Sequence, residues 1–254
     1  MPKISRLKAG LIHFSISLSL FTLVFFILFT LWYPEPFFTA GGGWQGLKII
    51  ASIDIVLGPL LTLVVFNPSK SLRELKLDLS VIGIMQLCAF CWGIFTVYQQ
   101  RPVAAVFYDE CFYTVSANEL TSQNYALSEL KRYSDLSPPL IFVERPTDTE
   151  GLKKFLARMR DDEIGPHLQT DNYQPLTKHF NELSNARLNI EKLRSKSVDL
   201  NNQIEQFLQN SGLTPSDIQF YLLKAKYQDM VLIFKTNGEL VGHLMLPTKA
   251  AADI

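Results

Sequence analysis

One carboxylate stands inside an apolar segment that is long enough to cross a lipid bilayer. The segment reads IIASIDIVLGPLLTLVVFNPSK, runs from Ile49 to Lys70, and carries Asp54 followed by the pair Gly58-Pro59. An ionised aspartate near the middle of a membrane helix costs about 2.5 to 3.5 kcal/mol on insertion scales, so it normally faces protein or water, or stays protonated. Asp54 is therefore the first candidate for a functional residue.

A structural role is the alternative for Asp54. Polar side chains commonly cross-link membrane helices through hydrogen bonds, so the carboxyl group could serve only to hold a helix bundle together. Pro59 has no N–H, and we expect it to kink the helix one turn below Asp54 and to free a backbone carbonyl near the carboxyl group. The sequence leaves both interpretations open.

Two further motifs match known redox, metal-binding or nucleotide-binding patterns, but they lie in or between apolar spans, where that chemistry is not expected. Cys88 and Cys91 form a CxxC motif in the middle of an apolar run, where a thiolate is disfavoured and no second ligand pair exists. We interpret them as two small polarizable residues on one helix face. The stretch GGGWQG, 41–46, matches the dinucleotide-binding pattern G-x-G-x-x-G, but it lies between two apolar spans rather than between a strand and a helix. It is predicted to be a flexible turn.

The sequence offers no positive evidence for an enzyme. It contains no nucleophile elbow, zincin motif or Walker A loop, and the four histidines, His13, His167, His179 and His243, lack metal-site spacing. We therefore predict no catalytic residues, no metal and no cofactor. Three cysteines cannot form a disulfide framework. From residue 101 onward, 20 acidic residues against 17 basic ones leave no basic footprint for nucleic acid.

Three uncharged or nearly uncharged runs predict three transmembrane helices, at about 9–33, 47–67 and 79–100. Each is long enough to cross about 30 Å of hydrocarbon. The first run is longer than the apolar region of a signal peptide and is followed by no A-x-A-like site, so we expect it to be retained. The predicted domains are a membrane anchor over 1–100 and a second domain over 101–254.

The positions of basic residues predict the orientation of these helices. One side of the membrane would carry six basic residues and the other only two. The six are Lys3, Arg6, Lys8, Lys70, Arg73 and Lys76, and the two are Lys48 and Arg101. By the positive-inside rule the N-terminus is cytoplasmic, and with three spans the second domain is exported, into the periplasm of a Gram-negative cell. Counted along these predicted spans, Gln86 would lie about 9 Å deeper in the membrane than Asp54, so that a direct bond would need helix tilt or a water.

The exported segment predicts an α+β fold. Apolar β-branched and aromatic runs at 101–115 and 137–146 predict strands, and Asn237-Gly238 between Met230–Phe234 and Leu240–Leu246 predicts a two-residue hairpin turn. Between them, 149–163 has the apolar spacing of a short amphipathic helix with Thr149 as its cap.

A longer amphipathic helix is predicted over 178–210 and is expected to end at Gly212. Apolar residues recur there at intervals of three and four, with one polar break at Ser197. This pattern suits either a coiled-coil arm for a partner helix or a helix that covers the sheet. The residues of this candidate helix interface are Leu183, Ile190, Leu193, Leu200, Ile204 and Phe207.

With these segments placed, the chain resembles the TfpX/TfpZ family of type IV pilin accessory proteins over nearly its whole length. Four places carry the resemblance. They are Asp54 with Leu57–Thr62, Gln86–Gly93 in the third span, Arg101-Pro102-Val103 leading to Val106-Phe107, and the terminal hairpin around Gly238. Nothing is carried over to the tail TKAAADI.

The resemblance implies an inner-membrane protein with a periplasmic domain, which acts as a chaperone or assembly modulator for a particular major pilin. Its implied partners are that pilin, the inner-membrane pilus assembly machinery and the lipid bilayer. Two other classes stay open from the residues alone. One is a membrane-bound thiol oxidoreductase that uses the CxxC motif, and the other is a ligand-sensing membrane protein with an exported domain.

Overall fold

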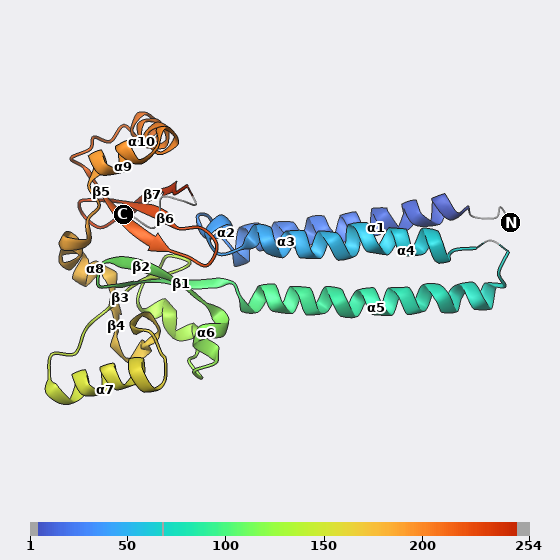
Figure 1. Ribbon diagram of the computed structural model, residues 1–254, viewed down its shortest axis with the longest axis horizontal. Helices are drawn as coiled ribbons and strands as arrows, with labels where there is room; N and C mark the ends of the chain where they lie inside the picture. Colours follow the sequence, from blue (N-terminus) through green and yellow to red (C-terminus); the bar gives the residue numbers. More distant parts are fainter. Residues whose placement is uncertain (1–4, 68, 248–254) are drawn as a thin grey trace. The chain divides into compact units, whose positions relative to one another are not determined.

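The computed structural model describes residues 5–67 and 69–247, which form two compact units (Figure 1). The first unit is built from residues up to Phe38 and from Gly42–Gln100, and the second from Thr39–Gly41 and from Arg101 onward. Lys3, which counted toward the predicted orientation, and the tail 248–254 lie outside the described residues.

The first unit contains three helices that are long and apolar enough to cross a membrane. The first is α1 (Arg6–Ile27), which continues as a π-helical turn η1 (Leu28–Trp32). The second joins α3 (Gly43–Ala51), the π-helical turn η2 (Ser52–Leu57) and α4 (Gly58–Val65) into one rod. The third is α5 (Leu72–Gln99), and a short helix α2 (Phe37–Ala40) lies between the first two. The prediction of three such helices is confirmed.

Two helix boundaries were predicted wrongly, and local chemistry explains both. The helix α5 begins at Leu72 rather than at 79 because Ser71 and Glu74 form a capping box, in which each side chain accepts a hydrogen bond from the other's backbone N–H. The helix α3 begins at Gly43, so four of the six residues of the expected flexible turn over 41–46 are helical. Only Gly42 has a left-handed φ of 98°.

The second unit is organised on a mixed seven-stranded sheet with the order β4-β3-β1-β2-β5-β6-β7. The predicted strands β1, β2, β3, β6 and β7 are confirmed, whereas the edge strand β4 and the interior strand β5 were not predicted. Neighbouring pairs are antiparallel except β1/β3 and β2/β5, which are parallel. The strands are β1 (Pro102–Tyr108), β2 (Cys111–Ser116), β3 (Leu140–Val143), β4 (Tyr173–Pro175), β5 (Ile218–Lys224), β6 (Met230–Lys235) and β7 (Leu240–Met245).

Short helices complete this unit and cover the sheet. They are α6 (Ala117–Thr121), η3 (Leu127–Arg132), α7 (Thr149–Asp161), η4 (Pro166–Leu168), η5 (Thr170–Asn172), α8 (Leu176–His179), η6 (Phe180–Ala186), α9 (Ile190–Lys196) and α10 (Val198–Ser211). One face of the sheet carries Val106 and Cys111 and is covered by two separate helical groups. The group with α7 covers β1–β3, and α9 with α10 covers β5–β7.

The opposite face of the sheet is aromatic. Phe107 and Phe112 meet edge to face with ring centroids 5.1 Å apart, and Phe112 stacks on Phe234 at 5.6 Å. Phe180 of η6 covers Phe234 from outside the sheet at 5.4 Å. Such ring pairs contribute about 0.5–1.5 kcal/mol each beyond the area they bury, so this cluster holds the two halves of the sheet together.

The predicted single helix over 178–210 is wrong, because the chain breaks twice within it. Asn189 caps α9 by accepting hydrogen bonds from Glu191 and Lys192, and Ser197 caps α10 by accepting one from Leu200. Between η6 and α9, Leu188 forms an isolated β-bridge with Phe220. Asparagine and serine satisfy the free amides of a helix N-terminus, so each starts a new helix here.

Without a single long helix there is no coiled-coil arm over 178–210, and the two shorter helices α9 and α10 cover the sheet. Leu193, Leu200 and Ile204 are buried in one cluster with β5–β7, and Ile190 and Phe207 pack against it. Leu183 is also fully buried, but it belongs to η6 rather than to this helix pair. Gly212 ends α10 in the left-handed conformation, as predicted.

Two predicted details of the second unit need correction. The cap of α7 is Asp148 rather than Thr149, since the Asp148 side chain accepts a hydrogen bond from Gly151 N–H at 2.7 Å. The hairpin turn holds three residues rather than two, because Lys235 N–H pairs with Glu239 and only Gly238 of the turn has a positive φ. A type I′ turn needs two residues with positive φ.

We predict that Leu193→Asp destabilises the second unit by at least about 3 kcal/mol, because it places an unpaired charge in the core. Val198→Asp is the matched control, since Val198 is 80% exposed whereas Leu193 is 1% exposed. Urea unfolding of the second unit in detergent-solubilised protein measures both. Equal stability of the two variants would contradict the placement of Leu193 in the core.

Stability should also depend on pH through His243 of β7. Burial lowers the pKa of His243, so the folded state binds this proton less readily than the unfolded chain does. Stability therefore falls as the pH drops below about 6.5, the ordinary histidine pKa. We expect His243→Gln to reduce the decrease in the free energy of unfolding between pH 7 and pH 5. A variant with an unchanged slope would contradict this assignment.

Candidate functional site

Asp54 lies in the π-helical turn η2 and faces protein. Its side chain is 4% exposed, and its neighbours are Gln86 of α5, which is its hydrogen-bonding partner, and His13 of α1. The carboxylate oxygen Oδ2 is buried, and no described residue gives it a hydrogen bond. The observed helix boundaries explain why the predicted depth difference from Gln86 was wrong. Asp54 is 11 residues from Gly43 and Gln86 is 13 from Gln99, so the two levels differ by only about 3 Å.

Gly58 and Pro59 create the space and the backbone geometry that this contact needs. A Cβ atom at Gly58 would lie 2.7 Å from Gln86 Cδ, so only glycine leaves room for Gln86 beside Asp54. Pro59 has no N–H to donate, and in the turn before it Gly58 N–H donates to Ile53 O, five residues back. The sequence singled out Asp54, Gly58, Pro59 and Gln86 separately, and the structure brings them together.

A second polar pair lies in the same bundle. His13 Nδ1 and Thr62 Oγ1 are 2.6 Å apart, and Thr62 is buried. His13 was weighed above only as a metal ligand, and not as a polar residue inside an apolar span. Its position inside an otherwise uncharged span was the available signal, because ionisable residues within membrane helices are rare and usually functional.

His13 and Thr62 line an apolar groove of about 400 Å³. The groove lies between α1, α4 and α5, at the end of the helices that contains Ala9 and Phe66. Gly83 of α5 lines it, and no atom lies within 4 Å of where a Cβ atom at Gly83 would be. The arrangement can accept an apolar segment and offer it one polar contact.

The opposite end of the bundle is closed. There Leu28, Phe90 and Val97 share an apolar cluster, and Tyr33 donates a hydrogen bond from its hydroxyl to Val97 O at 2.8 Å. The groove is therefore a local opening at one end and does not run the length of the helices.

The remaining predicted residues do not join this site. Pro102 begins β1 and pairs with Ser116, and Arg101 O accepts a hydrogen bond from Ala117 N–H, so both belong to the second unit. Cys88 and Cys91 are free, exposed thiols on α5. Among the described residues, no group of three His, Cys, Asp or Glu side chains could hold a metal ion.

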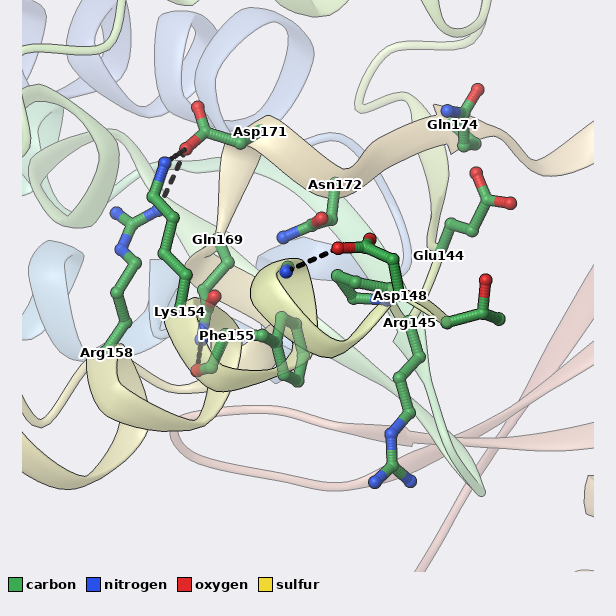
Figure 2. A pocket seen from close by; sticks show the side chains of 13 residues that line it. Glu144, Arg145, Asp148, Lys154, Phe155, Arg158, Gln169, Asp171, Asn172 and Gln174 are labelled. Atoms are coloured by element: carbon green, nitrogen blue, oxygen red, sulfur yellow. Dashed lines mark hydrogen bonds and ion pairs between the residues drawn. The ribbon is translucent and has the colours of Figure 1, made fainter.

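Figure 2 shows a polar pocket of about 420 Å³ beside α7 in the second unit. Two of its basic side chains, Lys154 and Arg158, face Asp171 at 3.9 Å and 3.3 Å. Gln169 is fully buried and donates from Nε2 to Phe155 O at 3.0 Å. Because these contacts tie α7 to η5 and the turn before it, we assign this pocket a structural role.

Comparison with known proteins places the chain in a family. The family model described as fimbrial assembly protein FimB matches residues 2–42, which include His13. The fimbrial assembly protein of serogroups C1 and C2 from Dichelobacter nodosus is 42% identical over 100 residues, which cover 39% of this chain and 76% of that protein. The chain belongs to the fimbrial assembly protein family.

Two further fimbrial assembly proteins of Dichelobacter nodosus are similar over smaller shares of their length. The serogroup I protein is 41% identical over 100 residues, 39% of its own length and of this chain. The serogroup E1 protein is 33% identical over 146 residues, 55% of its own length and 57% of this chain. No solved structure matches the chain. The predicted role in pilus biogenesis is thus supported at the level of fimbrial assembly.

We predict that Gly58→Ala destabilises this fimbrial assembly protein by about 1–3 kcal/mol, because the new methyl group pushes Gln86 away and leaves the Asp54 carboxyl group without its partner. Gly83→Ala is the matched control, since its methyl group meets open space. Thermal unfolding in detergent micelles measures both. Equal melting temperatures for the two variants would show that the Gln86 contact contributes nothing.

Proposed function

We propose that this chain is an inner-membrane accessory protein of type IV pilus assembly, of the TfpX/TfpZ type, and that it binds the transmembrane helix of an unassembled pilin. The observation that carries the proposal is the groove of about 400 Å³ whose lining includes the pair His13 and Thr62. Before assembly, a pilin subunit is a membrane helix joined to an exported head. A chaperone or assembly modulator for it therefore needs a surface inside the membrane.

The lining of the groove suits a helix better than a lipid acyl chain. His13 and Thr62 can hydrogen bond with a polar side chain or a backbone group, which a hydrocarbon chain lacks. The small residues Ala9 and Gly83 allow a helix backbone to come close, as small residues do at membrane helix interfaces.

The proposed orientation places the groove at the cytoplasmic side. Arg6, Lys8, Arg73 and Lys76 flank the same ends of the helices as the groove, and the positive-inside rule places those ends in the cytoplasm. A processed pilin begins its membrane helix at the cytoplasmic side, so the groove would meet the first turns of that helix. The second unit would then be periplasmic.

Protease treatment of spheroplasts tests the orientation. We expect added protease to degrade the second unit while a cytoplasmic control protein stays intact. Protection of the second unit to the same degree as that control would overturn the orientation, and with it the cytoplasmic position of the groove.

Filling the groove tests the proposed function. We predict that Gly83→Phe leaves the protein at its normal level in the membrane, because its side chain enters open space, but lowers the number of surface pili at least tenfold. Met85→Phe on the same helix is the matched control, because Met85 is 70% exposed and does not line the groove. Normal piliation with Gly83→Phe would contradict the proposal.

Two substitutions of Asp54 distinguish a structural role in the helix bundle from a direct role in contact with pilin. Asp54→Asn keeps the hydrogen bond with Gln86, whereas Asp54→Leu removes it. Because Asp54 is buried inside the bundle, we expect Asn to support normal piliation and Leu to lower the amount of protein in the membrane. Loss of pili at normal protein level with both variants would show instead that the carboxylate acts directly on pilin.

A further inference from the structure

The turn between β5 and β6 is hydrogen-bonded to a loop that joins two of the long apolar helices. This loop is Thr39–Gly41, which leads into α3 and belongs to the second unit. Tyr227 N–H of the turn donates a hydrogen bond to Ala40 O at 3.1 Å, and Ala40 is fully buried. Because the loop connects two helices that are each long enough to cross a membrane, it would lie at the surface of a bilayer that they span. The turn would then lie at that surface as well.

The topology of the sheet brings the same turn to the end at which the chain arrives from α5. Only two residues separate the end of α5 from Pro102, the first residue of β1. Pro102 pairs with Ser116 at the end of β2. The strand β5 runs parallel to β2, with Lys224 opposite Tyr113, so the turn after β5 continues toward the Ser116 end. Two separate connections from the apolar helices therefore lead to the end of the sheet that carries the β5–β6 turn.

Aromatic residues mark a membrane surface at the corresponding ends of the helices. Trp32 ends the first apolar helix, Trp44 lies at the start of the second, and Tyr98 lies near the end of the third. Trp44 and Tyr98 are 50% and 40% exposed. Tryptophan and tyrosine collect where the hydrocarbon of a bilayer meets its headgroups. Within the described residues, the last two turns at the opposite ends of these helices contain neither residue type.

The β5–β6 turn exposes two side chains that suit a headgroup layer. Its backbone is fixed, because Asp229 accepts a hydrogen bond from Ala225 N–H at 3.0 Å and another from Leu246 N–H at 3.3 Å. Lys226 and Tyr227 are the exposed residues of the turn, and Lys226 Nζ lies 5.8 Å from the centre of the Tyr227 ring. Tyrosine has an apolar ring with a polar hydroxyl, and lysine an apolar stem with a charged tip, so both bridge apolar and charged surroundings.

We infer that the β5–β6 turn is a phospholipid-binding site that holds the second unit on the surface of the membrane. The Tyr227 ring enters the headgroup layer, and the Lys226 ammonium binds headgroup phosphate. The inference rests on one part of the proposed function, namely that the three apolar helices span a bilayer. It needs neither pilin nor a particular orientation, because the turn meets whichever membrane surface the second unit faces.

Photo-crosslinking to lipid tests the inference, and the turn at the other end of β6 is the matched control. Benzoylphenylalanine replaces either Tyr227 or Thr236 in the full chain, which is placed in nanodiscs of phosphatidylglycerol and phosphatidylethanolamine. Thr236 is also exposed, but the six residues of β6 separate it from the β5–β6 turn by about 20 Å. We expect at least tenfold more phospholipid adducts from position 227 than from position 236.

Charge reversal tests the role of Lys226. In the chain with the crosslinker at position 227, we expect Lys226→Glu to lower the yield of phospholipid adducts at least threefold, because a carboxylate repels phosphate. Lys235→Glu is the control, since Lys235 ends β6 on the side of the Thr236 turn, and it should change the yield less than 1.5-fold.

The outcomes distinguish this inference from the pilus role. Equal lipid adducts from positions 227 and 236, adducts from position 227 to protein alone, or an unchanged yield with Lys226→Glu would each overturn the inference. Absence of lipid adducts together with normal piliation overturns the inference alone. Lipid adducts from position 227, in a chain whose loss leaves piliation normal, support the inference and overturn the pilus role alone.

Discussion

The unit of three apolar helices depends on burying one carboxyl group inside the bundle. Burial of the Asp54 carboxyl group among apolar side chains costs free energy that protein contacts must offset, and Gln86 on α5 supplies the hydrogen-bonding group. Gly58 gives Gln86 room, and the π-helical turn before Pro59 carries Asp54. This contact joins the second and third helices near their middle. With the closed cluster at one end, it leaves the other end free to open around His13 and Thr62.

The two units differ in how much of their apolar surface they bury. The three long apolar helices expose much of their apolar surface, which suits a lipid environment, and their buried polar residues provide directional contacts. The second unit buries a continuous aromatic face and closes its other face with separate helices. That division leaves the parallel joint of the sheet less covered, and a cavity of about 600 Å³ lies beside it.

Much of this architecture could be predicted from local sequence, and the failures have identifiable causes. The spans and the strands β1, β2, β3, β6 and β7 follow from hydropathy and residue type. The capping box at Ser71 was also present in the sequence, but hydropathy alone placed the helix start too late. The spacing across 178–210 continued through two caps, and Leu188 left the helical path to bridge Phe220, a contact 32 residues away that no local pattern contains.

The groove could not be predicted either, because it also depends on a contact between residues that are far apart in the sequence. His13 and Thr62 are 49 residues apart, and only the packing of α1 on α4 brings them together.

Site-specific photo-crosslinking from position 83 in intact membranes tests most directly whether the groove binds the membrane helix of a pilin, with position 85 as the control. We expect crosslinks from position 83 to the first turns of the pilin membrane helix and none from position 85. Crosslinks from position 83 to lipid alone, or equal pilin crosslinks from both positions, would contradict it.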